Sequence, residues 1–271
     1  MKPDVGVVIV TYNRINLLKI TLCKVLAQTF PNMEVLVVDN CSTDGTEDFL
    51  NSLNNVSILP LPENLGPAGG FHEGIKHFAE KSNVEYVWLM DDDFFPFESC
   101  LENLLTIANN NTMVFPYIRE KDFISRRDPG WWGVLIPISI IKKVGYPMKE
   151  LFFWTEDSEY LLHRIRAKYK YKAQWVPAAK GVHFTKRETN HRPPWKFYYE
   201  TRNMLYMRLY ERDITIQRSS KLVKSWVKLL GSILLKENNK IEKLKMFFRG
   251  TKDGIQQKLG KKVDPITGLY S

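Results

Sequence analysis

The chain has 271 residues, of which 44% are hydrophobic and 13% aromatic, enough for one substantial core with or without a smaller appendage. This composition excludes a wholly disordered chain. The net charge of +9 is uneven, because residues 218–249 contain nine Lys or Arg and two Glu, and a basic tail of this kind is weak support for nucleic-acid binding. We therefore expect a globular protein without a nucleic-acid partner.

Four short apolar runs predict strands that are buried on both faces of a parallel sheet. They cover residues 5–10, 35–38, 56–59 and 84–90. The first run, VGVVIV, is too short and wrongly flanked for a signal peptide or a membrane span. Three widely spaced cysteines without a CxxC pair indicate neither a disulfide framework nor a zinc site. Both observations favour a cytoplasmic protein.

Helical patterns lie between these strands. Residues 17–26 and 71–79 carry apolar side chains at helical spacing, and Asp44 followed by Glu47 resembles a capping box before a third, short helix. Alternating strands and helices predict an α/β domain with three layers. Ligands of such sheets bind beyond the carboxyl ends of the strands, where residues 11–14, 39–44, 64–70 and 91–93 supply polar groups.

Three consecutive carboxylates end the run YVWLMDDD. Neighbouring like charges need compensation by water or by a cation, and Mg²⁺ or Mn²⁺ often binds one or two carboxylates while substrate phosphates complete its coordination. Asp91 and Asp93 would point the same way in an extended chain and could share an ion, with Asp92 directed elsewhere, toward a ribose. The triplet alone fits an acidic loop as well, but its place at a strand end favours a metal site.

Other polar groups at these strand ends suit a nucleotide. Asp39 could accept an N–H of a base such as uracil, and the Gly-rich segment 63–74 suits the close approach of a diphosphate, although a tight turn would also explain its glycines. Arg14 and Arg202 are candidate diphosphate partners because a guanidinium pairs bidentately with phosphate oxygens. Each arginine would also fit a surface ion pair.

The pattern changes in the C-terminal part of the chain. After residue 110 it becomes mixed α+β, and from Pro193 and Pro194 onward it predicts Lys-rich helices, so we divide the chain into residues 1–193 and 194–271. Apolar residues within 222–234 fall at helical spacing with Lys largely opposite. Such a helix can lie on an anionic membrane surface or dock on the first domain, and a homodimer through these helices is left open.

The motifs TYNR, VVDNCSTDGT, NLGPAGGFHEG and WLMDDD have the order and spacing of the inverting family 2 glycosyltransferases with the GT-A fold, and the resemblance covers roughly residues 4–210. The form NLGPAGGFHEGI…VWLMDDDFFP…WWG…FFWTEDSEY…VHF…YYETRN is most similar to the galactofuranosyltransferase and rhamnosyltransferase branch. The resemblance implies a mostly parallel sheet flanked by helices with a C-terminal helical extension, and a divalent cation, Mn²⁺ or Mg²⁺.

The resemblance also implies roles for particular residues. Asp157, in WTEDSEYLLHRI, would be the catalytic base, although an Asp there also fits a helix N-cap. The metal ligands would be Asp91, Asp93 and His183. The residues that bind the nucleotide sugar would be Thr11, Tyr12, Arg14, Asp39, Asn64, Gly69, Gly70, Asp91, Asp92 and Arg202. The acceptor would contact Trp131, Trp132 and Glu156, and the two tryptophans fit a core role equally.

Taken together, these features favour an enzyme that moves a sugar from a nucleotide-diphosphate donor to a hydroxyl of a growing, lipid-linked glycan at the inner face of the cell membrane. UDP-galactofuranose is the preferred donor and dTDP-rhamnose the alternative. A nucleotidyltransferase is disfavoured because VTYNRINLLK lacks a basic, Gly-rich triphosphate loop. A non-catalytic glycan-binding protein would leave the placement of Asp91, Asp93, Asp157 and His183 unexplained.

Overall fold

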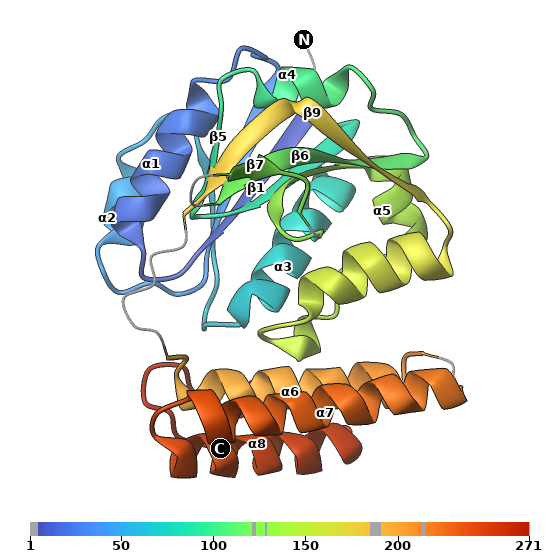
Figure 1. Ribbon diagram of the computed structural model, residues 1–271. Helices are drawn as coiled ribbons and strands as arrows, with labels where there is room; N and C mark the ends of the chain where they lie inside the picture. The colour runs from blue at the N-terminus through green and yellow to red at the C-terminus, as the bar shows by residue number, and fades with distance from the viewer. Residues whose placement is uncertain (1–4, 121–122, 128, 185–190, 213–214, 271) are drawn as a thin grey trace. The chain divides into compact units, whose positions relative to one another are not determined.

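The computed structural model describes residues 5–120, 123–127, 129–184, 191–212 and 215–270. The chain divides into two compact units (Figure 1). The first contains residues 1–148 and 157–186, and the second contains residues 149–156 and 187–271. The short segment 149–156 therefore belongs with the C-terminal helices, whereas the sequence led us to place a single boundary after residue 193.

The first unit is built on one sheet. Its strands are β1 (Val5–Thr11), β2 (Met33–Asp39), β3 (Ser57–Pro60), β4 (Tyr86–Asp91), β5 (Phe94–Pro96), β6 (Thr112–Glu120), β7 (Phe123–Ser125), β8 (Trp132–Pro137) and β9 (Lys172–His183). They lie in the order β3-β2-β1-β4-β8-β6-β9-β5, and β7 pairs with β6. The predicted parallel arrangement is confirmed for β1 to β4. Beyond β4 the sheet is mixed, because β8 runs antiparallel to β4 and β6.

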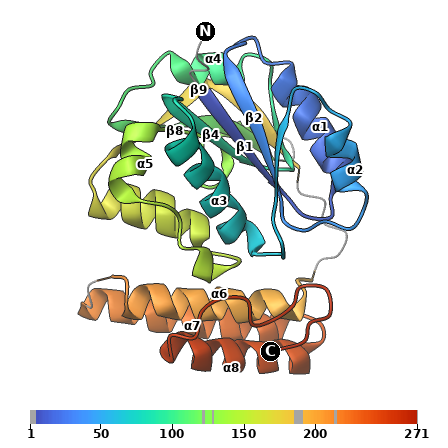
Figure 2. The ribbon, with the colours of Figure 1, turned by 180° about the vertical axis from the view of Figure 1, so that it is seen from behind.

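Helices cover both faces of this sheet. They are α1 (Ile15–Leu26), α2 (Thr46–Asn51), α3 (Gly66–Lys81), α4 (Cys100–Leu105), α5 (Ile138–Val144) and the π-helix η2 (Ser158–Lys168). One core cluster joins Val7 and Ile9 to α1, α2 and α4, and the other joins Val8 and Val10 to α3, α5 and η2. Figure 2 shows α3 and α5 in front of the sheet. The three layers predicted from the alternating pattern are confirmed, since successive residues of β1 are buried on opposite faces.

The glycines of NLGPAGGFHEG lie inside α3 and serve its packing. A Cβ on Gly70 would lie 2.4 Å from Val10 Cγ1, and one on Gly74 would lie 2.5 Å from Val8 Cγ1. A Cβ on Gly69 would lie 2.3 Å from the Cβ of Leu65. Both residues are buried and a side chain would collide with protein atoms there, so packing accounts for these glycines, and their predicted role at a diphosphate stays a prediction.

The second unit is helical. It consists of the 3₁₀ turn η1 (Lys149–Leu151) and the helices α6 (Pro194–Leu209), α7 (Ile216–Lys236) and α8 (Lys240–Ile255). The predicted helix start at the two prolines is confirmed, with Pro193 as the N-cap of α6. Phe197, Leu229, Ile233 and Phe247 form a core shared by the three helices. Within the described ranges, no helix is long and apolar enough to cross a membrane.

Candidate active site

The carboxylate triplet lies at the edge of the sheet where the parallel strands end. The strand register places Val10 of β1 beside Asp91 of β4, and Thr11 beside Asp39 of β2. Polar groups from three neighbouring strands therefore meet at one edge, as the sequence predicted.

Asp92 is an internal residue of this edge. It is 3% exposed and accepts hydrogen bonds from Thr11 Oγ1 (2.8 Å) and Arg14 Nη1 (3.0 Å), while its carbonyl accepts one from Thr21 Oγ1 (2.5 Å). Burial raises the pKa of Asp92 to about 6, although Arg14 acts in the opposite direction. The expectation that Asp92 faces a ribose is wrong, because both carboxylate oxygens are occupied by neighbouring side chains inside the protein.

Arg14 bridges two of the carboxylates. Its Nη1 lies 3.0 Å from Asp92 Oδ1 and 2.9 Å from Asp93 Oδ2, and its side chain is 51% exposed. Burial by itself would lower the pKa of Arg14, but Asp92 and Asp93 outweigh that effect and raise it. Arg14 thus compensates the negative charge of the triplet, with half of its side chain still open to a ligand.

The structure brings Asp93 and His183 together. Phe94 of β5 pairs with His183 of β9, so the neighbouring Asp93 comes close to the imidazole, and Asp93 Oδ1 lies 3.5 Å from His183 Nε2. This Oδ1 is buried and has no hydrogen-bond partner, whereas Oδ2 is held by Arg14. A buried acceptor without a donor is costly, and a divalent cation would satisfy it.

The predicted set of three protein ligands, Asp91, Asp93 and His183, is not assembled. The chain turns at Asp92 and Asp93, so Asp91 and Asp93 do not alternate as they would in an extended strand. Across the described ranges, no group of three or more His, Cys, Asp or Glu side chains is arranged to hold a metal. One carboxylate and one imidazole still fit Mn²⁺ or Mg²⁺, because these ions take their remaining ligands from substrate phosphates and water.

Two residues that were predicted to bind the nucleotide form hydrogen bonds within the adjoining loops. Asp39 is 4% exposed, and its Oδ1 accepts from Ser42 N (3.1 Å) and Ser42 Oγ (2.5 Å). Asn64 Oδ1 accepts from Gly66 N (2.8 Å) at the start of α3. Tyr12, between Thr11 and Arg14, is half-buried. These contacts hold the backbone of the loops that follow β2 and β3.

Asp157 precedes the π-helix η2, as its helix-capping interpretation predicts. Its Oδ1 accepts from Ser158 N (2.5 Å) and Ser158 Oγ (3.1 Å). Burial raises the pKa of Asp157, while the Ser158 hydrogen bonds act to lower it. A carboxylate whose pKa is raised is a better proton acceptor than an ordinary Asp. The neighbouring candidate, Glu156, is 7% exposed.

The two adjacent tryptophans have different surroundings. Trp131 is 3% exposed and stacks on Phe71 of α3 with ring centroids 4.3 Å apart, so it belongs to the core and its predicted role as a sugar platform is wrong. Trp132 is half-buried and stacks on His183 at 4.7 Å. Trp131, which precedes β8, packs in the core cluster that contains α3, whereas Trp132, the first residue of β8, packs against the cluster on the other face of the sheet.

The predicted diphosphate role of Arg202 is also corrected. Arg202 is 0% exposed in the helical unit, and its guanidinium donates to the carbonyls of Leu151 (2.7 Å) and Gly260 (2.5 Å) and to Asn203 Oδ1 (2.8 Å). A buried guanidinium whose three nitrogens all have protein acceptors is a structural group. The position of Arg202 in a sequence motif did not show that it is buried, whereas Arg14 is half exposed.

One neighbour of the site is absent from every motif considered above. Glu120 at the end of β6 lies 3.0 Å from His183 Nδ1. No local pattern marks it, because the register between β6 and β9 brings the two residues together across 63 positions of sequence.

Comparison with known proteins identifies the family. The family description Glycosyl transferase family 2 matches residues 6–212. The chain belongs to this family. WfaP of Escherichia coli, named UDP-Glc:alpha-D-GlcNAc-diphosphoundecaprenol beta-1,3-glucosyltransferase, is 26% identical over 125 residues, which are 44% of this chain and 48% of WfaP. The matched segment thus spans about half of that relative.

Solved structures show the same fold. TarS 1-349 of S. aureus in complex with UDP-GlcNAc superimposes with a TM-score of 0.61 at 18% identity, over 94% of this chain and 81% of that one. The mannosyltransferase PcManGT of Pyrobaculum calidifontis, in complex with GDP-Man and Mn²⁺, gives a TM-score of 0.60 at 14% identity, over 95% and 88%. These similarities confirm the predicted GT-A fold with C-terminal helices.

Proposed function

We propose that this protein transfers galactofuranose from UDP-galactofuranose, with inversion, to a hydroxyl of a growing, lipid-linked cell-surface glycan. The observation that carries the proposal is the pair formed by Asp93 and His183 at the ligand-binding edge of a family 2 fold, with a buried carboxylate oxygen that lacks a donor. The choice of sugar depends on the form of the motifs alone. dTDP-rhamnose is the second candidate donor.

The chain's own residues supply the remaining chemistry. Asp157 accepts the proton of the acceptor hydroxyl while the new bond forms between that oxygen and the anomeric carbon. The bond from the anomeric carbon to the diphosphate breaks on the opposite face, and the nucleoside diphosphate leaves. A divalent cation held by Asp93 and His183 would neutralise charge on the leaving diphosphate. Arg14, half exposed beside Asp93, is placed to support the same group.

A donor panel tests the reaction. Release of nucleoside diphosphate would be measured from UDP-galactofuranose, dTDP-rhamnose, UDP-glucose and UDP-N-acetylglucosamine, with Mn²⁺ and with chelator. We expect turnover of UDP-galactofuranose only in the presence of metal. Turnover of another donor would reject the proposed sugar while keeping the enzyme class, and metal-independent turnover would reject the role of Asp93 and His183.

A histidine substitution tests the metal pair. His183→Ala removes one of the two side chains that fit the ion, so we expect a higher Mn²⁺ concentration for half-maximal activity. His77→Ala, in α3, is the matched control and is expected to leave that concentration unchanged. Equal metal dependence of the wild type and His183→Ala would make His183 a packing residue.

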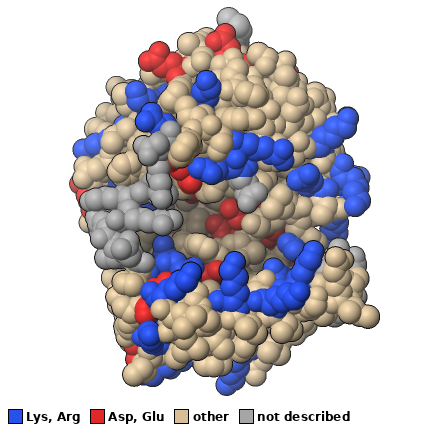
Figure 3. Space-filling model, in the orientation of Figure 1, with Lys and Arg blue, Asp and Glu red and all other residues tan. Residues whose placement is uncertain are grey.

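We also propose that the second unit holds the enzyme at an anionic membrane surface. Leu222, Leu229 and Ile233 of α7 are buried against the other helices, but Val223 and Val227 are 60% and 54% exposed, and Leu235 is 82% exposed. Exposed Lys side chains of α7 stand next to them, namely Lys221, Lys224, Lys228 and Lys236. Figure 3 shows Lys and Arg side chains over the C-terminal helices as well as over the first unit. Apolar side chains flanked by Lys suit the interface of an anionic bilayer.

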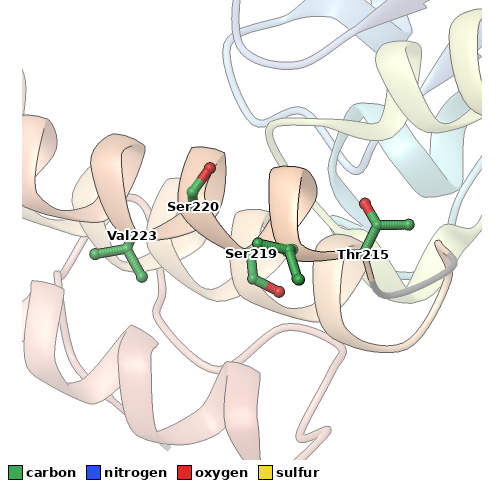
Figure 4. Close-up of a pocket in the computed structure, with 5 residues that line it drawn as sticks. Thr215, Ser219, Ser220 and Val223 are labelled. Atoms are coloured by element: carbon green, nitrogen blue, oxygen red, sulfur yellow. The ribbon is translucent and has the colours of Figure 1, made fainter.

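The first turns of α7 add to this surface. A shallow cavity of about 500 Å³ is lined by Thr215, Ile216, Ser219, Ser220 and Val223 (Figure 4). Ile216 is 92% exposed. The exposed apolar side chains therefore extend from the start of α7 to its last turn. WfaP acts, by its name, on an undecaprenol-linked acceptor, which supports a position near lipid for the present chain.

Point substitutions test this surface better than truncation, because removal of α7 and α8 would expose the core around Phe197 and Phe247. The double variant Val223→Ser, Val227→Ser is expected to lower binding to vesicles that contain anionic lipid. Val223→Leu, Val227→Leu is the control and should retain it. Equal vesicle binding by both variants would reject membrane attachment through this face.

A further inference from the structure

A carboxylate outside the sequence motifs stands behind the candidate metal pair. Glu120, the last residue of β6, has its Oε1 3.0 Å from His183 Nδ1, while Arg127 Nη2 lies 3.4 Å from its Oε2. The other ring nitrogen, Nε2, lies 3.5 Å from Asp93 Oδ1. His183 therefore has a carboxylate at each of its two ring nitrogens.

The sheet fixes this arrangement. Strand β9 lies between β6 and β5, with Val182 beside Arg119 and His183 beside Phe94. Glu120 follows Arg119 and Asp93 precedes Phe94, so the two carboxylates approach the imidazole from neighbouring strands on opposite sides. Trp132 stacks on the ring at 4.7 Å. The ring is thus held at one nitrogen by Glu120 and on one face by Trp132.

This geometry determines which nitrogen can bind a cation. A neutral imidazole that donates Nδ1–H to a carboxylate has its lone pair on Nε2, the form that can bind a cation. His183 Nε2 and Asp93 Oδ1 are then two acceptors that face each other across 3.5 Å, and Oδ1 is buried without a hydrogen-bond partner. Two facing acceptors repel each other, and a shared cation turns this repulsion into attraction.

We propose that Glu120 is a positioning residue that directs His183 Nε2 at the metal and thereby favours Mn²⁺ over Mg²⁺. Imidazole is a better ligand for Mn²⁺ than for Mg²⁺, which prefers oxygen. Glu120 touches neither donor nor acceptor in this scheme and acts only through His183. The inference rests on the proposed function to the extent that the chain binds a divalent cation.

The test measures metal binding directly. Mn²⁺ would be titrated into the protein at fixed UDP, with free Mn²⁺ followed by electron paramagnetic resonance and Mg²⁺ affinity obtained by competition. Glu120→Ala is expected to weaken Mn²⁺ binding about 10- to 100-fold and Mg²⁺ binding less. Glu120→Gln keeps an acceptor oxygen and should lose less than Glu120→Ala. Glu98→Ala, an exposed carboxylate of the same unit, is the control for charge.

A double-mutant cycle separates positioning from general stability. In the His183→Ala background, Glu120→Ala should have no further effect on Mn²⁺ affinity, because Glu120 acts on the metal only through the His183 imidazole. Additive losses, or unchanged Mn²⁺ affinity and selectivity in both Glu120 variants, would overturn the inference while the proposed function stands. Failure of the wild type to bind Mn²⁺ would overturn this inference together with the metal part of the proposed function.

Discussion

Two buried polar regions of this protein differ in how completely their hydrogen bonds are satisfied. In the helical unit, the Arg202 guanidinium donates to protein acceptors from all three of its nitrogens, and Asp253 accepts from the hydroxyls of Tyr198 and Tyr270, both at 2.7 Å. At the sheet edge, Asp93 Oδ1 is buried without any donor. A hydrogen-bonded network of this kind stabilises a fold, whereas the open acceptor of Asp93 is the observation on which the proposed metal site rests.

The largest expected effect is on catalysis, from a change that leaves stability intact. Asp157→Asn keeps the shape of the side chain but removes the proton acceptor, so we expect kcat to fall about 10³-fold, within the range for loss of a general base. The melting temperature and donor affinity should change little. The measurement is single-turnover transfer beside donor titration. Wild-type turnover by the variant would remove Asp157 from the role of base.

The saturated region should respond in the opposite way. Arg202→Met leaves the carbonyls of Leu151 and Gly260 buried without donors, so we expect a loss of about 3 kcal/mol of unfolding free energy. Urea unfolding would measure it. Arg249→Met, at an exposed position of the same unit, should stay within about 0.5 kcal/mol of the wild type. Similar values for the two variants would contradict the structural role of Arg202.

Helix packing in the second unit gives a smaller effect with a matched control. A Cβ on Gly250 of α8 would lie 2.4 Å from the carbonyl oxygen of Tyr198, a backbone atom of α6, so Gly250→Ala should cost about 1–3 kcal/mol. Gly231 of α7 has nothing within 4 Å of its added Cβ, and Gly231→Ala should stabilise by about 0.5–1 kcal/mol. Thermal melts of both variants would show shifts of opposite sign; shifts of the same sign would reject the close approach of α6 and α8.

The smallest expected effect is a displacement of the pH profile. The folded-state pKa of Asp157 lies above the usual value, so the carboxyl still holds its proton at a pH where an ordinary Asp has lost it. Activity should therefore fall on acidification at a higher pH than for an ordinary Asp. Ser158→Ala removes a hydroxyl that favours the ionised form and should move this acidic limb further upward. A shift of the acidic limb to lower pH in Ser158→Ala would contradict the role of Asp157 as the catalytic base.

Much of the first unit follows from local sequence. The runs that become β1, β2 and β4 are apolar enough to be buried on two faces, and the periodicity of α1 and α3 needs no distant partner. The same prediction is wrong for β3, which lies at the edge of the sheet with Ser57 and Pro60 exposed. The capping box was misplaced by one residue: α2 starts at Thr46 with Gly45 as its N-cap, and Asp44 accepts from Thr46 N and from Ile15 N of α1. One carboxylate oxygen of Asp44 therefore contacts a second helix, α1, and the spacing of residues within this segment cannot predict that contact.

The sequence by itself determined the alternation of strands and helices and the appearance of carboxylates at the end of a buried strand, because burial and backbone period act over a few residues. Only the tertiary structure decided which polar groups are saturated. It placed Trp131 in the core and Trp132 on His183, surrounded the Arg202 guanidinium with backbone carbonyls, and brought Glu120 to His183. These outcomes depend on strand register and helix packing across many positions, and therefore on contacts that only the complete fold makes.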